Sequence, residues 1–294
     1  MSNDMKTLSV LLHAASKVGK TTLGATSPFP ICDLDAEGGG KFLPGSPHLT
    51  ALLGRPLRVI EWDPSQPPPH WDGSWDVAMV RVIGGQAWQT VQKTYQWLQT
   101  GRHQFQTIMV DSISEIQRRA KQELVGADQL KIQHWGQLLT VMDNVIRGFR
   151  DFTNDPYNPI RVAVFIAETR ENQKGKFIPY MQGQISIALP YWMDIVGYLY
   201  VDQAIGIDPG TGQQVQVPVR QLLVAPHPSF EAGERVQGLV GPVITDPNIS
   251  AILEKVYPQV QAPQPEFYQD PNTGAWYFKD PATGQWYPYS NQTA

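Results

Sequence analysis

The sequence has very little cysteine. Its single cysteine, Cys32, can form no intramolecular disulfide, which suits a reducing compartment. Cys32 lies in the apolar run FPICDLD without a basic neighbour, so we expect a buried small hydrophobe and not a reactive thiol. The six histidines are scattered and give no zinc-binding spacing. No Gly-x-Ser-x-Gly element or other nucleophile constellation occurs either.

The sequence also lacks a membrane-spanning run, a secretory signal and an excess of positive charge. Its longest apolar stretch, IALPYWMDIVGYLYV, contains a proline and an aspartate and is too short to cross a bilayer. The N-terminus has no basic region followed by an apolar core. The net charge of −4 argues against a broad basic face that grips duplex DNA by charge alone. We therefore expect a soluble, cytoplasmic protein with no membrane partner.

Short apolar runs alternate with helical segments along most of the chain. Residues 86–99 place Trp88, Val91, Tyr95 and Leu98 at helical spacing, which favours a core stripe over a base-stacking platform. This alternation predicts an α/β fold with a mostly parallel central sheet flanked by helices. Two later strands joined by PGTGQQ predict a β-hairpin near the C-terminal side of this domain. The strands are expected in the runs TLSVLLH, PICDLD, LRVIEW, DVAMVRV, FQTIMVD and RVAVFIAE, and further helices at 112–125 and 133–152.

The composition predicts three parts: a main domain at 1–257, a linker rich in proline and glutamine at 258–265, and a tail at 266–294. The tail contains a tandem ten-residue repeat, DPNTGAWYFK followed by DPATGQWYPY. Each DPxTG is expected to form a turn between short aromatic strands. The aromatic rings are too many for so small a core, so the hairpins are expected to stack on each other, on the main domain or on a partner protein.

A phosphate-binding loop is predicted where the first strand ends. The pattern Ala14-x-x-x-x-Gly19-Lys20-Thr21 follows an apolar strand and opens a helix, which is the context that this motif requires. Alanine replaces the usual first glycine, but the backbone N–H groups that hold phosphates remain. Lys20 would meet the outer phosphates of ATP, and the Thr21 hydroxyl would bind Mg²⁺. The residues expected to hold the nucleotide are Ala14, Ala15, Ser16, Lys17, Val18, Gly19, Lys20, Thr21 and Thr22.

Two acids follow other predicted strands. Asp111 ends the run TIMV and is expected to hold Mg²⁺ together with Thr21, although it could instead cap the next helix. Glu37 ends CDLDAE and is the candidate general base for an attacking water, with a plain turn carboxylate as the alternative. Parallel sheets gather such residues at the carboxyl ends of their strands.

Three segments resemble the bacterial recombinase RecA, and most closely the phage-encoded RecA-like ATPases that assist single-strand annealing. These are DLDAEGG, IMVDS and VFIAETRENQKGK. The resemblance implies a RecA-like P-loop core in a homo-oligomeric ring or filament, located in the host cytoplasm if phage-encoded. It implies that Glu37 activates water, that Lys20 is catalytic, and that Glu168 or Thr169 senses the γ-phosphate. The family more often has an amide or histidine at that last position.

The same resemblance implies a loop that binds single-stranded DNA after the VFIAE strand. Basic side chains that contact phosphates, together with aromatic rings that stack, would bind single strands with little sequence preference. The alternative is a solvated hairpin whose positive charge is balanced by Glu168 and Glu171. Arg235 would act as an arginine finger toward the next subunit, or else simply pair with Glu231. The residues expected at the DNA are Arg170, Lys174, Lys176, Phe177 and Tyr180.

The sequence therefore predicts an ATPase that binds single-stranded DNA and promotes annealing or strand exchange. One alternative is a helicase loader or another motor or switch on the same core. Another is a non-hydrolysing nucleotide-gated scaffold, whose aromatic tail recruits a single-strand-binding or replication protein.

Overall fold

The structure is a computed structural model that describes residues 6–125, 132–207, 210, 212–258, 266–271, 273–279 and 284–289. The chain divides into two compact units, Met1–Val256 and Tyr257–Ala294. The predicted linker at 258–265 lies outside the described residues from 259 onward. No helix among the described residues is long and apolar enough to cross a membrane.

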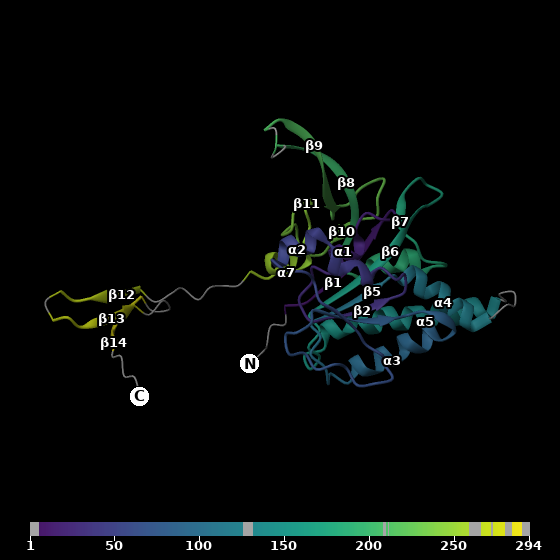
Figure 1. Ribbon diagram of the computed structural model, residues 1–294, viewed down its shortest axis with the longest axis horizontal. Coiled ribbons are helices and arrows are strands. Elements are labelled where there is room, and N and C mark those ends of the chain that lie inside the picture. The colour runs from purple at the N-terminus through teal and green to yellow at the C-terminus, as the bar shows by residue number, and fades with distance from the viewer. Residues whose placement is uncertain are drawn as a thin grey trace. The chain divides into compact units, whose positions relative to one another are not determined.

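A mixed sheet forms the centre of the first unit (Figure 1). Its main path runs β11-β9-β8-β1-β6-β5-β2-β4-β3, with β10 beside β8 and β7 beside β6. All pairs from β8 to β3 are parallel, so the carboxyl ends of these strands share one edge. The strands are β1 (Leu8–Ala14), β2 (Ile31–Asp35), β3 (Val59–Glu61), β4 (Val77–Arg81), β5 (Thr107–Asp111), β6 (Val162–Glu171), β7 (Phe177–Pro179), β8 (Ile195–Ile207), β9 (Gln214–Leu223), β10 (Gly233–Glu234) and β11 (Val243–Thr245).

The predicted α/β class, the parallel sheet and the six expected strand runs are confirmed. The helices are α1 (Lys20–Gly24), α2 (Pro47–Leu53), α3 (Ala87–Gln99), α4 (Ile113–Val125), α5 (Ile132–Asp151), α6 (Ile185–Ala188) and α7 (Ile249–Val256). Within the described residues, short 3₁₀ turns occur at Gly40–Gly45, Gly84–Gln86, Phe152–Asn154 and Leu189–Trp192.

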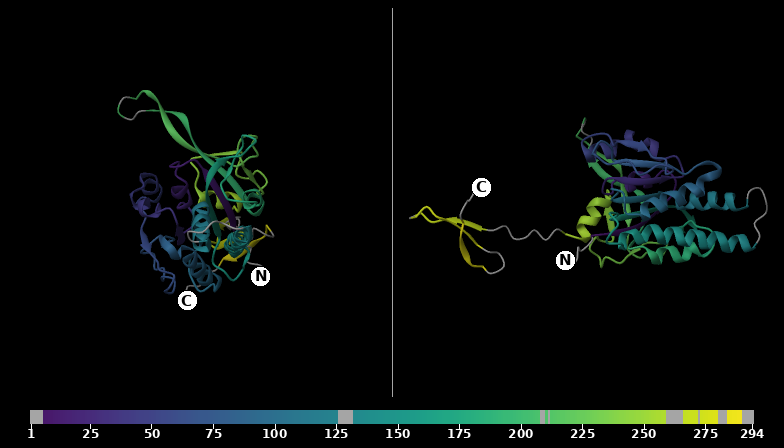
Figure 2. Two further views of the ribbon diagram at one scale, coloured as in Figure 1. Left: turned by 90° about the vertical axis from the view of Figure 1, so that its right-hand side faces the viewer. Right: turned by 90° about the horizontal axis from the view of Figure 1, so that it is seen from below.

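Helices α3, α4 and α5 lie side by side and build the larger core with the sheet (Figure 2). Val91 and Leu98 of α3 are fully buried, and Trp88 and Tyr95 pack against the same cluster. The aromatic stripe of this helix is therefore core, as predicted. A Cβ at Gly148 of α5 would lie 2.6 Å from the Tyr95 ring, so glycine is what lets α3 and α5 approach here.

The predicted hairpin is confirmed as β8 and β9, and it projects well beyond the rest of its unit (Figures 1 and 2). Its antiparallel ladder runs from the pair Tyr198 and Leu223 to the pair Ile207 and Gln214. In the described structure, only the N-terminal part of β8 also pairs with β1 and β10. The C-terminal part of β8 carries exposed apolar side chains, among them Val201 and Ile205.

The second unit is a three-stranded antiparallel sheet of β12 (Glu266–Gln269), β13 (Trp276–Lys279) and β14 (Trp286–Tyr289). The first repeat turn is closed by a hydrogen bond from the Gly274 N–H to the Asp270 carbonyl (2.8 Å). Aromatic side chains on this small sheet remain exposed, including Phe267, Trp276 and Trp286. In its described residues the repeat thus forms aromatic strands, with a turn between β12 and β13, as the pattern predicts. The second DPxTG turn lies outside the described residues.

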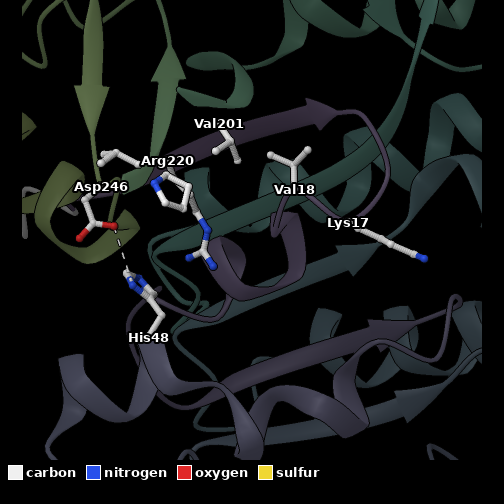
Figure 3. A pocket seen from close by; sticks show the side chains of 8 residues that line it. Lys17, Val18, His48, Val201, Arg220 and Asp246 are labelled. Atoms are coloured by element: carbon white, nitrogen blue, oxygen red, sulfur yellow. Dashed lines mark ion pairs between the residues drawn. The ribbon is translucent and has the colours of Figure 1, made fainter. Parts of the chain in front are cut away.

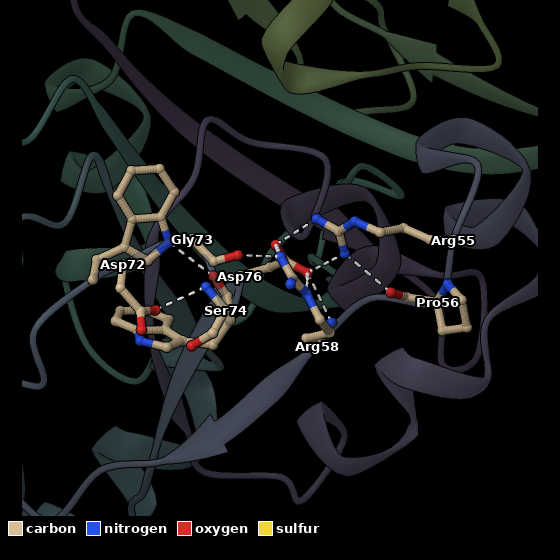
Figure 4. A network of polar contacts seen from close by, with 9 residues as sticks. Arg55, Pro56, Arg58, Asp72, Gly73, Ser74 and Asp76 are labelled. Carbon is tan, nitrogen blue, oxygen red and sulfur yellow. Dashed lines mark hydrogen bonds and ion pairs between the residues drawn. The ribbon is translucent and has the colours of Figure 1, made fainter.

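A buried carboxylate fixes the start of β4 (Figure 4). Asp76 is almost completely buried and accepts hydrogen bonds from the guanidinium groups of Arg55 (2.6 and 2.7 Å) and Arg58 (3.1 Å). It also accepts from the Arg58 backbone N–H (2.8 Å). Burial by itself raises the pKa of Asp76, but the hydrogen bonds from both arginines outweigh it and lower the pKa to about 2.

We predict that Asp76→Asn lowers the free energy of unfolding by about 2 kcal/mol at pH 7, because it removes a charge held by two partly exposed guanidinium groups. Because the pKa in the folded protein lies below the ordinary value of 3.8, the stabilising effect is complete above about pH 4 and disappears toward about pH 2. Urea unfolding of both proteins across this pH range measures the difference. Asp72→Asn, at an exposed carboxylate of the same region, is the control and should change little; an equal loss in both variants would contradict the prediction.

Candidate active site

The phosphate-loop residues lie at the carboxyl edge of the sheet, between β1 and α1. Ala14 ends β1, Lys20 begins α1, and the connecting loop contains left-handed backbone at Lys17 (φ +64°) and Gly19 (φ +104°). A left-handed conformation favours glycine, which fits the glycine at position 19. Ala15, Ser16 and Lys17 are exposed at the mouth of the loop. Thr21 and Thr22 lie in the first turn of α1.

The Lys20 ammonium reaches back across the loop. It donates to the carbonyls of Ala14 (3.3 Å) and Ala15 (3.1 Å). Partial burial lowers the pKa of Lys20, while the nearby acids Glu37, Asp111 and Glu168 raise it. The cation therefore stands inside a loop of backbone groups, in contact with two carbonyl oxygens and with acids around it.

Thr21 and Asp111, which are expected to be the magnesium ligands, are brought into direct contact. The Thr21 hydroxyl donates to Asp111 Oδ2, although β6 lies between β5, which ends at Asp111, and β1, the strand that precedes α1. Burial raises the pKa of Asp111 to about 7, against the hydrogen bond from Thr21, which lowers it. A hydroxyl and a carboxylate are the hard oxygen ligands that Mg²⁺ takes beside phosphates and water.

Glu37 lies next to this pair, on the loop that follows β2. The Ser112 hydroxyl donates to Glu37 Oε1, and the same Ser112 oxygen accepts from the Glu115 N–H (3.2 Å) at the start of α4. Ser112, and not Asp111, is thus the residue that caps α4. A Cβ at Gly39 would lie 3.4 Å from Thr21 Oγ1, so the loop runs close against the predicted magnesium ligand.

Asp35, which was not predicted from the sequence, anchors the loop that carries Glu37. Its carboxylate accepts from the N–H groups of Gly38 (2.6 Å), Gly39 (3.1 Å) and Gly40 (3.1 Å). Two positions earlier, Asp33 is fully buried and has no hydrogen-bond partner among the described residues. Burial first, and then Asp111 and Asp35, raise the pKa of Asp33 well above its ordinary value. The alternating DLD pattern on an otherwise apolar strand was the available signal for both.

The polar end of β6 is held by two neighbours. Glu168, a candidate γ-phosphate sensor, pairs with the Arg118 guanidinium through both oxygens (2.6 and 2.5 Å). The Thr169 hydroxyl contacts His13 Nδ1 (3.0 Å), and His13 Nε2 contacts the Glu231 carbonyl (2.6 Å). Burial lowers the pKa of His13 to about 4, so the ring is neutral and Nε2 carries the proton donated to that carbonyl.

The residues expected at DNA form the hairpin of β6 and β7. The Arg170 guanidinium lies over the Tyr180 ring, 5.2 Å from its centroid. Lys176 pairs with Glu231 (2.8 Å), and Phe177 stacks on Phe230 with centroids 5.6 Å apart. Lys174 is exposed and forms no ion pair with any described residue. The hairpin therefore presents Arg170 and Lys174, while Lys176 and Phe177 already have partners within the chain.

Arg235 is not brought to the phosphate loop of its own chain. It follows β10, which pairs with the start of β8 at the amino end of the parallel strands. Its backbone N–H donates to the Asp194 carbonyl (2.8 Å), and its guanidinium donates to the Tyr191 carbonyl. The alternative pairing of Arg235 with Glu231 is wrong, because Lys176 occupies that carboxylate.

A hollow of about 480 Å³ opens on the other side of the phosphate loop (Figure 3). His48 and Asp246 form an ion pair at its rim (3.8 Å), and the Arg220 side chain enters it from β9. Neither the hollow nor Arg220 was predicted from the sequence. The lining residues are Lys17, Val18, His48, Val201, Pro218, Val219, Arg220 and Asp246.

These residues fit a nucleotide with Mg²⁺. No group of three or more His, Cys, Asp or Glu side chains among the described residues could hold a metal ion alone. Magnesium in phosphate sites needs only one or two protein ligands, because phosphates and water complete its shell. Thr21 and Asp111 supply such a pair beside Lys20, and Gly19 occupies the left-handed position directly before it.

Comparison with known proteins identifies the family of the core. No curated protein matches the chain. The AAA domain family matches residues 6–236, which span β1 to β10 and leave the C-terminal sheet outside. The site described above lies within this match, apart from Asp246. The chain therefore belongs to the AAA domain family of P-loop NTPases.

Proposed function

We propose that this protein binds ATP with Mg²⁺ and hydrolyses it. The observation that carries the proposal is the contact between Thr21 and Asp111, made next to Lys20 and Glu37. Lys20 would exchange its two carbonyl contacts for the outer phosphates, where its charge counters theirs. Thr21 and Asp111 would hold the magnesium ion, which when bound neutralises charge on the phosphates.

Glu37 is the group that we assign to the attacking water. Its Oε1 accepts from Ser112, which orients the carboxylate, and Oε2 would accept the proton of the water. Because Asp35 fixes the following three glycine N–H groups, the loop that carries Glu37 has a defined path next to Thr21. Glu168 would act on the γ-phosphate only if its pairing with Arg118 were exchanged.

We further propose that hydrolysis is coupled to single-stranded DNA, in a RecA-like recombination protein that promotes annealing or strand exchange. The support is β6, which runs from Glu168 and Thr169 beside the nucleotide site directly into the hairpin that presents Arg170 and Lys174. Exposed basic side chains next to an aromatic ring suit sequence-tolerant binding of single-stranded DNA. In a ring or filament, Arg235 would complete the site of a neighbouring subunit.

Two alternatives keep the same nucleotide site. A helicase loader or another motor would hydrolyse ATP without annealing DNA. A non-hydrolysing scaffold would use the C-terminal sheet, whose exposed rings such as Trp276 and Trp286 suit recruitment of a single-strand-binding or replication protein. ATP turnover with and without single-stranded DNA, followed by an annealing assay, distinguishes the three.

Lys20→Ala is expected to weaken binding of Mg²⁺ and the non-hydrolysable analogue AMP-PNP by about 10- to 100-fold, because it removes a charge-assisted contact to the phosphates. Isothermal titration calorimetry measures the affinity. Lys93→Ala, at an exposed position of α3, is the matched control and should bind as the wild type does. Equal affinity in Lys20→Ala and wild type would refute the assignment of the loop.

Glu37→Gln is expected to reduce kcat for ATP hydrolysis by about 10²- to 10⁴-fold while leaving AMP-PNP binding within about threefold, since an amide cannot accept the proton of water. Steady-state phosphate release measures the rate. Glu61→Gln, at an exposed carboxylate of β3, serves as the control. Full turnover in Glu37→Gln would assign the base to another residue, and no turnover in wild type would favour the scaffold.

Replacing Arg170, Lys174 and Lys176 together with alanine is expected to weaken single-strand binding and to reduce its dependence on log salt by a slope of about 0.7 per lost phosphate contact. Fluorescence anisotropy with a labelled oligothymidylate at several salt concentrations measures both. Lys176→Ala alone should have the smallest effect, because that side chain already pairs with Glu231. An unchanged slope in the triple variant would contradict DNA binding by this hairpin.

A further inference from the structure

The Arg220 guanidinium lies directly against the phosphate loop of its own chain. A Cβ placed on Gly19 would be 3.1 Å from Arg220 Nε and 3.5 Å from Nη2. Arg220 belongs to β9, where it is opposite Val201 in the hairpin ladder, and its carbonyl accepts from the Asp246 N–H (2.8 Å). The ladder and this hydrogen bond fix the backbone from which the side chain reaches the loop (Figure 3).

Among the described residues, no acid forms an ion pair with this guanidinium. Arg220 is only partly exposed, yet it forms no ion pair within the part of the chain that the structure describes. The carboxylate that lines the same hollow, Asp246, lies 3.8 Å from His48 Nδ1 and forms no ion pair with Arg220. Lys17 adds a second cation to the hollow. A half-buried arginine without a carboxylate, held against a loop that binds phosphate, has the charge and the donor geometry for an anion.

The sheet order determines which end of a nucleotide would lie here. Thr21, Asp111 and Glu37, which act at the terminal phosphate, cluster toward β5 and β2 on one side of β1. The hollow lies toward β8 and β9, on the other side. A nucleotide whose last phosphate meets the acids must therefore leave the loop with its nucleoside toward the hollow.

The hollow has the size and lining that a sugar and base need. Its volume of about 480 Å³ lies within the range of ordinary ligand pockets, and its walls combine apolar surface with a few polar groups. Val201 and Pro218 supply apolar walls from the hairpin and Val18 from the loop, while His48 and Asp246 supply polar groups at the rim.

We propose that Arg220 binds the phosphate chain of the nucleotide in its own subunit, and that the hollow between the phosphate loop and the β8–β9 hairpin takes the nucleoside. This inference rests on the proposed binding of ATP, to which it adds the phosphate contact from β9 and the site of the sugar and base. It also makes the root of the projecting hairpin part of the nucleotide site.

The first experiment titrates wild type and Arg220→Ala with AMP-PNP and, separately, with inorganic tripolyphosphate, both with Mg²⁺, in a calorimeter. Arg220→Ala is expected to weaken both ligands by about 10- to 100-fold, because both carry the phosphates that the guanidinium contacts. Arg102→Ala, at an exposed loop position, controls for the lost charge and should bind normally. Normal binding of both ligands by Arg220→Ala overturns the phosphate contact.

Arg220→Gln, which keeps most of the side-chain volume, separates binding from folding. It is expected to lose as much affinity as Arg220→Ala while its thermal unfolding without nucleotide stays at the wild-type temperature. If Arg220 only covers the loop, the unfolding temperature of the variants falls and the affinity of the folded protein does not change, which also overturns the proposal.

The second experiment fills the hollow. Val201→Trp is expected to weaken AMP-PNP by about tenfold or more while tripolyphosphate binds as before, since only the nucleoside is displaced. Ile205→Trp is the matched control, because it lies farther out on the same face of the same strand and does not line the hollow. Equal AMP-PNP affinity in wild type and Val201→Trp would place the nucleoside elsewhere.

These outcomes distinguish failure of ATP binding itself from failure of the assignment of Arg220 and the hollow. If wild type binds neither ligand, ATP binding itself fails. If wild type binds and Lys20→Ala does not, while the Arg220 and Val201 variants bind normally, ATP binding stands and the assignment of Arg220 and the hollow is wrong.

Discussion

The site depends on one constraint of the sheet: the carboxyl ends of its parallel strands share an edge, and β6 is inserted between β1 and β5. The insertion separates the strand that begins the phosphate loop from the strand that ends in Asp111. Thr21 must therefore reach across the end of β6 to contact that carboxylate, and it does. Glu37 after β2, Asp111 at the end of β5 and Glu168 near the end of β6 then lie around the Lys20 ammonium.

The same inserted strand joins two surfaces of the molecule. Along its buried part β6 is apolar on both faces, as a central parallel strand must be. At its end Glu168 and Thr169 are tied to Arg118 and His13, and the chain then continues into the hairpin with β7. A change at the phosphate loop has a short, hydrogen-bonded route to the hairpin through these residues. This route is the physical basis on which coupling between nucleotide and DNA is proposed.

The strands and the core face of α3 were predicted correctly because they follow from continuous local patterns in the sequence. The strands came from apolar runs that are buried on both faces, and the core stripe of α3 came from helical spacing. The phosphate loop is one uninterrupted segment, so its residues could be named together. Asp111 and Glu37 could be singled out from the sequence because each lies at or just after the end of a recognisable strand. The carboxyl ends of parallel strands meet at one edge of the sheet. In every one of these cases the signal lies within about ten residues of the chain.

By itself, then, the sequence determined the α/β class, the phosphate loop, the acids at the strand ends and the aromatic strands of the tail, because each follows from local pattern. Only the tertiary structure decided which side chains meet across distant segments. Lys176 forms an ion pair with Glu231, and Phe177 stacks on Phe230. Glu168 pairs with Arg118, and the Arg220 guanidinium lies against Gly19. Strand order and hairpin register determine these contacts. Neither can be predicted from local sequence patterns, because the residues that meet are far apart along the chain.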